Sequence, residues 1–302
     1  MISHPAVVVC RKAAHENIVG GFQGEDRMKV TVLIENTRGE RDCLAEHGLS
    51  FYIETAKHKL LADTGASNRF LQNAGALKVD LREVDMAVIS HGHYDHAGGL
   101  MDFAEINPKA EILIRSSAGG EFYHQNAEFE KYIGIAPKIM ELPEVRLIEN
   151  DQRIDEEIFL FGNVTKRRLW PSGNRELKVK KDGVFFQDDF QHEQYLVIEE
   201  NGEKKPVLFS GCAHNGILNI LDRFEEIYKM EPAAVFSGFH MRKKSDYTRE
   251  DIETIEEIGR ELSRTRTRFY TGHCTGEIPF QVLKECMGEQ LVYVHSGDEV
   301  IL

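Results

Sequence analysis

The sequence lacks any long apolar run. No window approaches the roughly eighteen consecutive apolar residues of a membrane-spanning helix, so we expect no such helix and no membrane partner. The N-terminus also lacks the order of a secretory signal, because Arg11 and Lys12 follow the short apolar stretch 6–10 instead of preceding it. Residues 1–27 show no periodicity, and we expect them to form a tail or extension outside the folded domain.

Cysteine is scarce, and basic residues are outnumbered by acidic ones. The five cysteines are an odd number without the spacing of a disulfide framework, which favours reduced thiols and a cytoplasmic protein. The net charge is −13 at pH 7, and an acidic surface repels phosphate backbones at long range. Nucleic acid is therefore disfavoured as a partner, whereas the composition is compatible with a homo-oligomer.

From Met28 onward, segments with the alternating apolar pattern of strands are interspersed with segments that have helical periodicity. A helix is expected near 68–74, stopped by Gly75. Three more are expected: one from residue 217, one opened by a capping box at Thr248 and Asp251, and one with Pro279 in its first turn. Strands are expected at 29–34, 49–54, 59–62, 84–90, 110–114, 158–161, 195–199, 206–210, 233–237, 268–271, 291–295 and 299–302. The residues 200–203, Glu-Asn-Gly-Glu, predict a hairpin turn. Hairpins mixed with βα units indicate sheets packed face to face with helices outside.

One segment carries the strongest chemical signal, residues 90–99, Ser-His-Gly-His-Tyr-Asp-His-Ala-Gly-Gly. It places His91, His93, Asp95 and His96 directly after a buried strand. Neutral imidazole and carboxylate are strong ligands for Zn²⁺ and similar ions. In an extended stretch His91 and His93 point the same way and can hold one ion, while a helix starting near Asp95 turns Asp95 and His96 toward a second. Such a pair of ions acts on attacking and leaving oxygens together.

Three later strands each end in glycine and histidine, which favours a pocket shared with this segment. They are followed by Gly-Cys-Ala-His214, Gly-Phe-His240 and Gly-His273-Cys-Thr-Gly276. Thr275 and Gly276, before a helix, are expected to offer hydroxyl and N–H donors to an anionic substrate, with a simple helix cap as the alternative. Residues 115–190 read as β-rich structure that is partly an insertion over the site.

The His-x-His-x-Asp-His segment resembles the signature of the metallo-β-lactamase superfamily. Over residues 28–302 this resemblance implies one α+β domain, an αββα four-layer sandwich of two mixed sheets with flanking helices and metals at one edge. It implies that Asp63 supports the metal loop from behind, although a simple turn aspartate is an equal alternative. His273 matches the last metal histidine. Many members carry a bridging aspartate where this chain has Cys212, and His192 is either a further ligand or a surface histidine.

Together with Glu46-His-Gly-Leu-Ser50, the later motifs resemble one branch of that superfamily. It is the branch related to the dihydropterin–ribofuranosylaminobenzene phosphate synthase of methanopterin biosynthesis. The resemblance implies that His214 and His273 are the later metal ligands. It also implies that His240 lines the substrate site and contacts a phosphate or transfers a proton.

Two reactions fit these features. The first is hydrolysis of a small anionic, phosphorylated substrate by a metal-bound hydroxide, with Asp95 and His240 in catalytic roles and two divalent ions as cofactors, Zn²⁺ first and Mn²⁺ or Fe²⁺ as alternatives. The second is a transferase reaction of the synthase type, in which the metals activate a pyrophosphate leaving group. A redox di-iron protein is disfavoured because His93 stands where those proteins carry glutamate. A non-catalytic binding protein is disfavoured by the intact metal motif.

Overall fold

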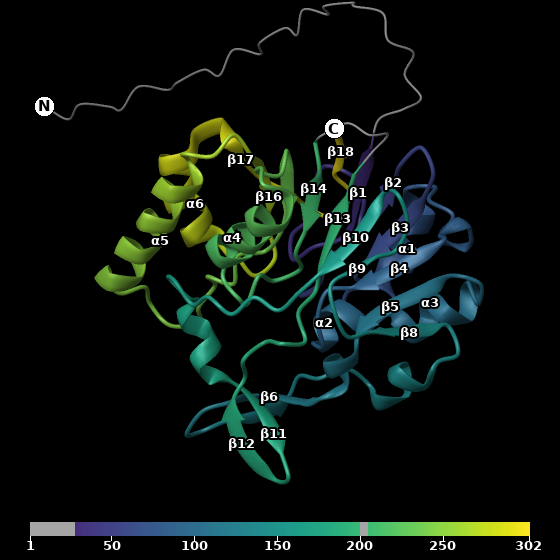
Figure 1. The fold of residues 1–302 in the computed structure, drawn as a ribbon, viewed down its shortest axis with the longest axis horizontal. Helices are drawn as coiled ribbons and strands as arrows, with labels where there is room; N and C mark the ends of the chain where they lie inside the picture. The colour runs from purple at the N-terminus through teal and green to yellow at the C-terminus, as the bar shows by residue number, and fades with distance from the viewer. Residues whose placement is uncertain (1–27, 200–204) are drawn as a thin grey trace, which may run out of the picture.

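The computed structural model describes residues 28–199 and 205–302. The proposed tail 1–27 and the hairpin turn at 200–203 lie outside the described residues. In the described part, two seven-stranded sheets face each other at the centre (Figure 1), and a four-stranded sheet projects below them. No helix in these ranges is long and apolar enough to cross a membrane.

The first sheet is antiparallel at one side and parallel at the other. Strands β18, β1, β2 and β3 pair antiparallel, and β3, β4, β5 and β8 pair parallel. In spatial order its strands are β18 (Glu299–Ile301), β1 (Lys29–Ile34), β2 (Ser50–Glu54), β3 (Lys59–Ala62), β4 (Met86–Ile89), β5 (Glu111–Arg115) and β8 (Val145–Ile148).

The second sheet has the same mixed character. Strands β14 to β17 pair parallel, whereas β9, β10, β13 and β14 pair antiparallel. In spatial order its strands are β17 (Leu291–Tyr293), β16 (Arg268–Thr271), β15 (Ala234–Phe236), β14 (Val207–Phe209), β13 (Tyr195–Ile198), β10 (Ile158–Phe161) and β9 (Gln152–Arg153). Two mixed sheets are what the resemblance implied.

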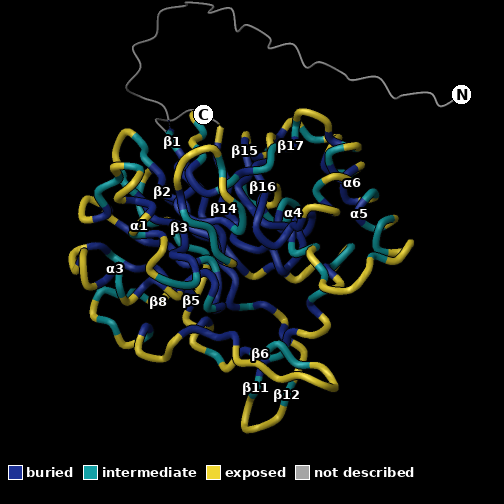
Figure 2. The backbone as a smooth tube through the Cα atoms, turned by 180° about the vertical axis from the view of Figure 1, so that it is seen from behind, coloured by how far each residue is buried: buried dark blue, intermediate teal, exposed yellow. Residues whose placement is uncertain are grey.

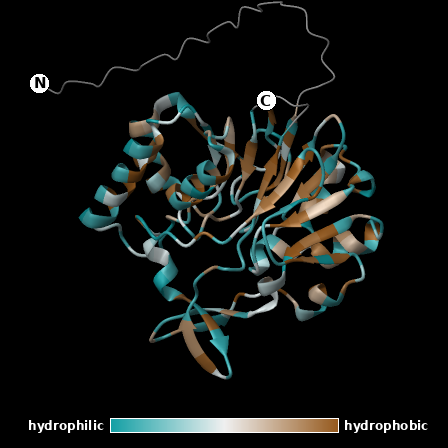
Figure 3. Cartoon of the chain, in the orientation of Figure 1, coloured by the Kyte–Doolittle hydropathy of each residue, from teal (hydrophilic) through white to brown (hydrophobic). Residues whose placement is uncertain are grey.

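Apolar side chains from both sheets interlock to form the central core. Phe51 of the first sheet meets Phe209 and Phe236 of the second edge to face, with ring centroids 6.1 and 5.7 Å apart. This aromatic geometry adds directional contacts to the burial that drives the sheets together. The strands are correspondingly the most hydrophobic part of the cartoon (Figure 3), and the interior is buried throughout (Figure 2).

Helices cover both outer faces, which completes the four layers and confirms the α+β sandwich. Phe70 and Phe103 pack on the first sheet, and Phe224, Ile258 and Leu283 pack on the second. The helices are α1 (Arg69–Ala76), α2 (Tyr94–Ala97), α3 (Leu100–Ile106), α4 (Ile217–Tyr228), α5 (Arg249–Leu262) and α6 (Glu277–Met287). The expectation that Gly75 stops the first helix is wrong, because α1 continues through it to Ala76.

The third sheet falls within the segment that was expected to contain an insertion. It is wholly antiparallel, in the order β12 (Val184–Gln187), β11 (Leu177–Lys181), β6 (Glu121–Gln125) and β7 (Glu130–Tyr132). Its own small core includes Phe122 and Phe190, and Tyr94 beside the histidine segment packs against it. The Tyr94 N–H also donates to the Ile133 carbonyl at 2.9 Å. This sheet is therefore attached directly to the loop that carries the histidines.

The capping box at the start of α5 is confirmed, and it gives a test of local stability. Thr248 Oγ1 accepts the Asp251 N–H, and the Asp251 carboxylate accepts the Thr248 N–H. Thr248→Ala should lower the free energy of unfolding by about 1 kcal/mol, because an orphan helix N–H loses its acceptor. Urea unfolding measures this change. Thr254→Ala in the same helix is the matched control and should be near neutral, and equal losses in both variants would contradict the role of the cap.

Candidate metal centre

The histidine segment leaves the first sheet at the carboxyl end of β4. All four proposed ligands in it are buried: His91, His93, Asp95 and His96 are at most 8% exposed. His93 is the extended residue before the single-turn helix α2, so the chain turns between His93 and Asp95 as expected. Backbone crowding requires glycine here, because a Cβ on Gly92 would lie 2.3 Å from the Ala118 carbonyl oxygen.

The later histidines come from the second sheet, where β14, β15 and β16 are parallel neighbours. Their carboxyl ends therefore lie at one edge, and the loops that follow carry His214, His240 and His273. His240 and His273 adopt positive φ angles of 48° and 52°, which a histidine rarely adopts without support from its surroundings. The structure thus brings both sets of histidines to one edge of the sandwich.

The proposed ligands form two adjoining sets. In the first, one ligand atom each from His91, His93 and His214 lie within 4.8 Å of one another. In the second, Asp95 Oδ2 lies 3.4 Å from His273 Nε2 and 3.9 Å from His96 Nε2. The rings of His91 and His96, with centroids 4.2 Å apart, join the two sets.

Four of these imidazoles have a buried nitrogen outside any hydrogen bond, although one of the four, His273 Nε2, faces the Asp95 carboxylate at 3.4 Å. The Nε2 atoms of His91, His93, His214 and His273 are buried and have no hydrogen-bond partner. A buried polar atom without a partner is costly, and it signals a missing ligand such as an ion. Three imidazoles in one set, and imidazoles with a carboxylate in the other, are donor sets that fit divalent transition metals such as Zn²⁺.

The opposite nitrogens of the rings are held by polar side chains. His96 Nδ1 lies 2.7 Å from Asp63 Oδ2, and His91 Nδ1 lies 2.9 Å from Ser90 Oγ. His214 Nδ1 lies 3.1 Å from Asn174 Oδ1, and His273 Nδ1 lies 2.8 Å from Asn36 Oδ1. Such partners orient a ligating imidazole and raise its basicity. The position of Asp63 is the one that the resemblance implied.

Two buried glutamates, which the sequence analysis did not single out, hold the loops of the later histidines. Glu193 accepts the backbone N–H groups of His214 and Asn215 at 2.6 and 2.9 Å. Glu35 accepts the backbone N–H of His273. Charge-assisted bonds of this kind are strong in a buried setting, so each loop has little freedom to move. The sequence pattern predicts neither contact. Glu35 lies in no histidine motif, and Glu193, although it directly follows His192, bonds to a loop 21 residues further along the chain.

Burial sets the protonation of the first set. It lowers the pKa of His91 and His214 well below the usual range and, with His192 nearby, lowers that of His93 to about 3. These three rings are therefore neutral at pH 7, which is the form that binds metal. Burial also opposes charge on His96, but Asp63 and Asp95 raise its pKa to about 9. The carboxylates around His96 thus favour a positive charge at this point, which a divalent ion also supplies.

The other predicted site residues take different positions. Both nitrogens of His192 form hydrogen bonds. Nδ1 accepts the Gly92 N–H at 3.0 Å, and Nε2 donates to Asp188 at 3.1 Å. His192 therefore supports the loop that carries His91 and His93. His240 lies beside His214, with ring centroids 4.1 Å apart and its buried Nδ1 unpartnered. Thr275 is fully buried, and its hydroxyl is engaged with Phe239 N–H and Thr271 Oγ1.

Polar side chains also lie at the outer rim. His47 is half exposed, its Nε2 lies 3.3 Å from Asp95 Oδ2, and it stacks on His273. Arg242 is exposed, and its Cβ and Cγ lie close to the backbone of Gly276. Its backbone N–H donates to the Cys274 carbonyl at 2.9 Å. Within the described parts of the chain, no carboxylate forms an ion pair with Arg242. The rim therefore offers a free cation next to the proposed metal set.

Comparison with known proteins agrees with this arrangement. A sequence model of the metallo-beta-lactamase superfamily matches residues 45–172. A crystal structure of a metal-dependent hydrolase of the beta-lactamase superfamily is 30% identical, covers 90% of this chain and 98% of that chain, and has a TM-score of 0.75. The chain belongs to the metallo-β-lactamase superfamily.

Further relatives place this metallo-β-lactamase-fold chain near the branch that its motifs resemble. The 7,8-dihydropterin-6-methyl-4-(beta-D-ribofuranosyl)-aminobenzene-5'-phosphate synthase of Methanocaldococcus jannaschii is 26% identical over 290 residues, 90% of this chain and 96% of that protein. An uncharacterised protein of the same organism is 29% identical over 224 residues, 72% of this chain and 81% of that protein. The metallo-beta-lactamase fold protein YhfI from Bacillus subtilis, 13% identical with a TM-score of 0.53, covers 92% of this chain and 100% of that chain and shares the fold.

The Asp63–His96 contact predicts a loss of metal affinity on Asp63→Asn. Asparagine tolerates the positive φ of 61° at this position, so the substitution removes the charge with little backbone strain. The affinity should fall about 10- to 100-fold, as for other lost outer partners of ligating histidines. Competition with a chromogenic chelator measures it. Asp182→Asn, exposed in the β11–β12 turn and also at positive φ, is the control, and an unchanged affinity in Asp63→Asn would refute the supporting role.

Proposed function

We propose that the protein is a metal-dependent hydrolase of a small anionic, phosphorylated substrate. It would bind two divalent ions at the edge of the sandwich, with Zn²⁺ as the preferred metal. The observation that carries this proposal is the set of four buried imidazole nitrogens without a hydrogen-bond partner, one of which, His273 Nε2, faces Asp95. His91, His93 and His214 would hold one ion, and Asp95, His96 and His273 the other. Bound there, the ions would lower the pKa of a water molecule and stabilise the negative charge that develops in the reaction.

Protein groups around the ions would do the remaining work. Burial opposes ionisation of Asp95, but His96 and His273 beside it hold its pKa well below the usual range, so it is a carboxylate at neutral pH. We infer that Asp95 orients the attacking water through a hydrogen bond. The unpartnered Nδ1 of His240 is placed next to His214, where it would contact the substrate phosphate or pass a proton to the leaving group.

Arg242 supports an anionic substrate. Its backbone N–H donates to the Cys274 carbonyl, next to the loop of His273. Burial lowers the pKa of His47 to about 4, with His273 and Arg242 adding to the shift and Asp95 opposing it. The Arg242 guanidinium would bind a phosphate through paired N–H groups. Gly276 allows this approach, since a Cβ there would lie 3.1 Å from the Cβ of Arg242.

A transferase reaction is the second candidate, and the synthase relative favours it because the similarity spans 90% of this chain. In that case the same ions would assist departure of pyrophosphate, and an arylamine would take the place of water. The two reactions are separated by offering the metal-loaded protein a phosphodiester panel and, separately, dihydropterin pyrophosphate with its arylamine partner. Turnover of the phosphodiesters supports the hydrolase. Turnover of the second pair alone would overturn it.

The role of Arg242 can be measured directly. Arg242→Ala should raise KM for a phosphorylated substrate about 10-fold, because a hydrogen bond to a charged group contributes about 1.5–3 kcal/mol and this one lies at an exposed rim. Metal content should stay the same, since Arg242 is in neither ligand set. Arg249→Ala, with a 92% exposed side chain on α5, is the control for loss of positive charge. Equal KM values in the two variants would exclude Arg242 from substrate binding.

A further inference from the structure

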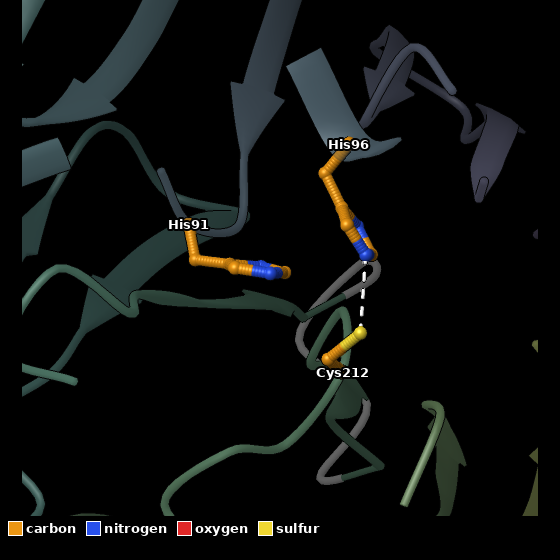
Figure 4. Close-up of side chains that lie close together, drawn as sticks. All are labelled: His91, His96 and Cys212. Atoms are coloured by element: carbon orange, nitrogen blue, oxygen red, sulfur yellow. Dashed lines mark hydrogen bonds between the residues drawn. The ribbon is translucent and has the colours of Figure 1, made fainter. Parts of the chain in front are cut away.

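Cys212 stands where many relatives of this fold are expected to carry a bridging aspartate, and its sulfur points into the metal centre. It follows β14 in the loop that carries His214, and it is 3% exposed. Figure 4 shows its Sγ aimed at the His96 ring, and the sulfur lies 3.1 Å from His96 Nε2. The thiol therefore faces a ligand atom that is proposed to bind an ion.

The sulfur also lies between the two ligand sets. One grouping within 4.8 Å contains Cys212 with His91 and His96, a second contains it with His214 and His240, and a third with His273 and Cys274. His91 and His214 belong to the first set, whereas His96 and His273 belong to the second. Cys212 is thus within reach of ligand atoms from both.

Independent evidence for an ion at this point comes from the surrounding imidazoles. The Nε2 atoms of His91, His214 and His273 are buried without hydrogen-bond partners, and their rings are at most 1% exposed. Ions that satisfy these nitrogens would lie within reach of the Cys212 sulfur, and thiolate and imidazole together are typical ligands of Zn²⁺.

The neighbouring Cys274 has a different position. Its Sγ accepts the His240 N–H at 3.2 Å and lies 3.5 Å from the Cys212 carbonyl oxygen. It also fills the space above Gly238, where a Cβ would lie 2.4 Å from the sulfur. Cys274 is therefore part of the packing between the loops after β15 and β16, which makes it a useful comparison for Cys212.

We propose that Cys212 is a thiolate ligand of this metal centre. The proposal rests on the proposed metal-dependent function. When an ion binds, the thiol would lose its proton to solvent and a sulfur lone pair would form the bond to the metal, so that the ligand would carry a single negative charge. Because thiolate is a soft ligand, the site selects Zn²⁺, Co²⁺ or Fe²⁺ over Mn²⁺ and Mg²⁺.

Cobalt substitution tests this ligand without reference to activity. The full-length protein is loaded with Co²⁺, and its metal content and near-ultraviolet absorption are recorded. We expect two ions per chain and a sulfur-to-cobalt charge-transfer band in the wild type and in Cys286→Ser, whose thiol lies between α5 and α6. Cys212→Asp should lose the band but keep two ions. Its affinity for Zn²⁺ relative to Mn²⁺ should fall, because a carboxylate oxygen is a harder ligand than a thiolate.

Each other result has a definite meaning. Two bound ions without the band in the wild type, or a band that survives in Cys212→Asp, would overturn the assignment of Cys212 as a thiolate ligand and leave the metal-dependent function intact. A band lost only in Cys274→Ser would assign the sulfur ligand to Cys274 and also overturn it. No bound ion in the folded wild type would remove the proposed function itself. Cys212→Ser, close to cysteine in size, repeats the comparison if the aspartate variant fails to fold.

Discussion

Four imidazole nitrogens meet inside the protein with no hydrogen-bond partner, and the surrounding loops are arranged to keep them there. Each buried unpaired group costs about 1–3 kcal/mol, so the four together oppose folding by an amount comparable with the net stability of a domain. Two cations that together accept these four lone pairs would remove this cost. Folding and metal binding are therefore expected to be coupled in this protein.

The sandwich supplies the rigidity that such an arrangement needs. Parallel strands of both sheets end at one edge, so short loops from β4, β14 and β16 reach the same point. Buried carboxylates hold the backbone of two of these loops. Glu193 accepts the N–H of His214, and Glu35 accepts the N–H of His273. Phe190, which belongs to the small core of the third sheet, stacks on the His214 ring with the ring centroids 4.5 Å apart. Geometry that depends on so many fixed groups is suited to holding ions in place before a substrate arrives.

Features that depend on residues close together in the chain were predicted correctly from the sequence. The periodicity of β1 and α4, the capping box at Thr248 and the turn between His93 and Asp95 are local properties, and the structure has them. Contacts between segments far apart in the chain could not be predicted from the sequence. Glu35 lies 238 residues from His273, and His192 resembles a ligand by its position although its ring supports the Gly92 loop. Cys212 lies within reach of both ligand sets only because the two sheets pack against each other, which the sequence does not show.

Anomalous diffraction from crystals grown with Zn²⁺ would show whether two ions occupy this edge of the sandwich. We predict two anomalous peaks, one in contact with Nε2 of His91, His93 and His214 and the other with Asp95, His96 and His273. A single peak, or peaks bound to other residues with the four Nε2 atoms left free, would contradict it.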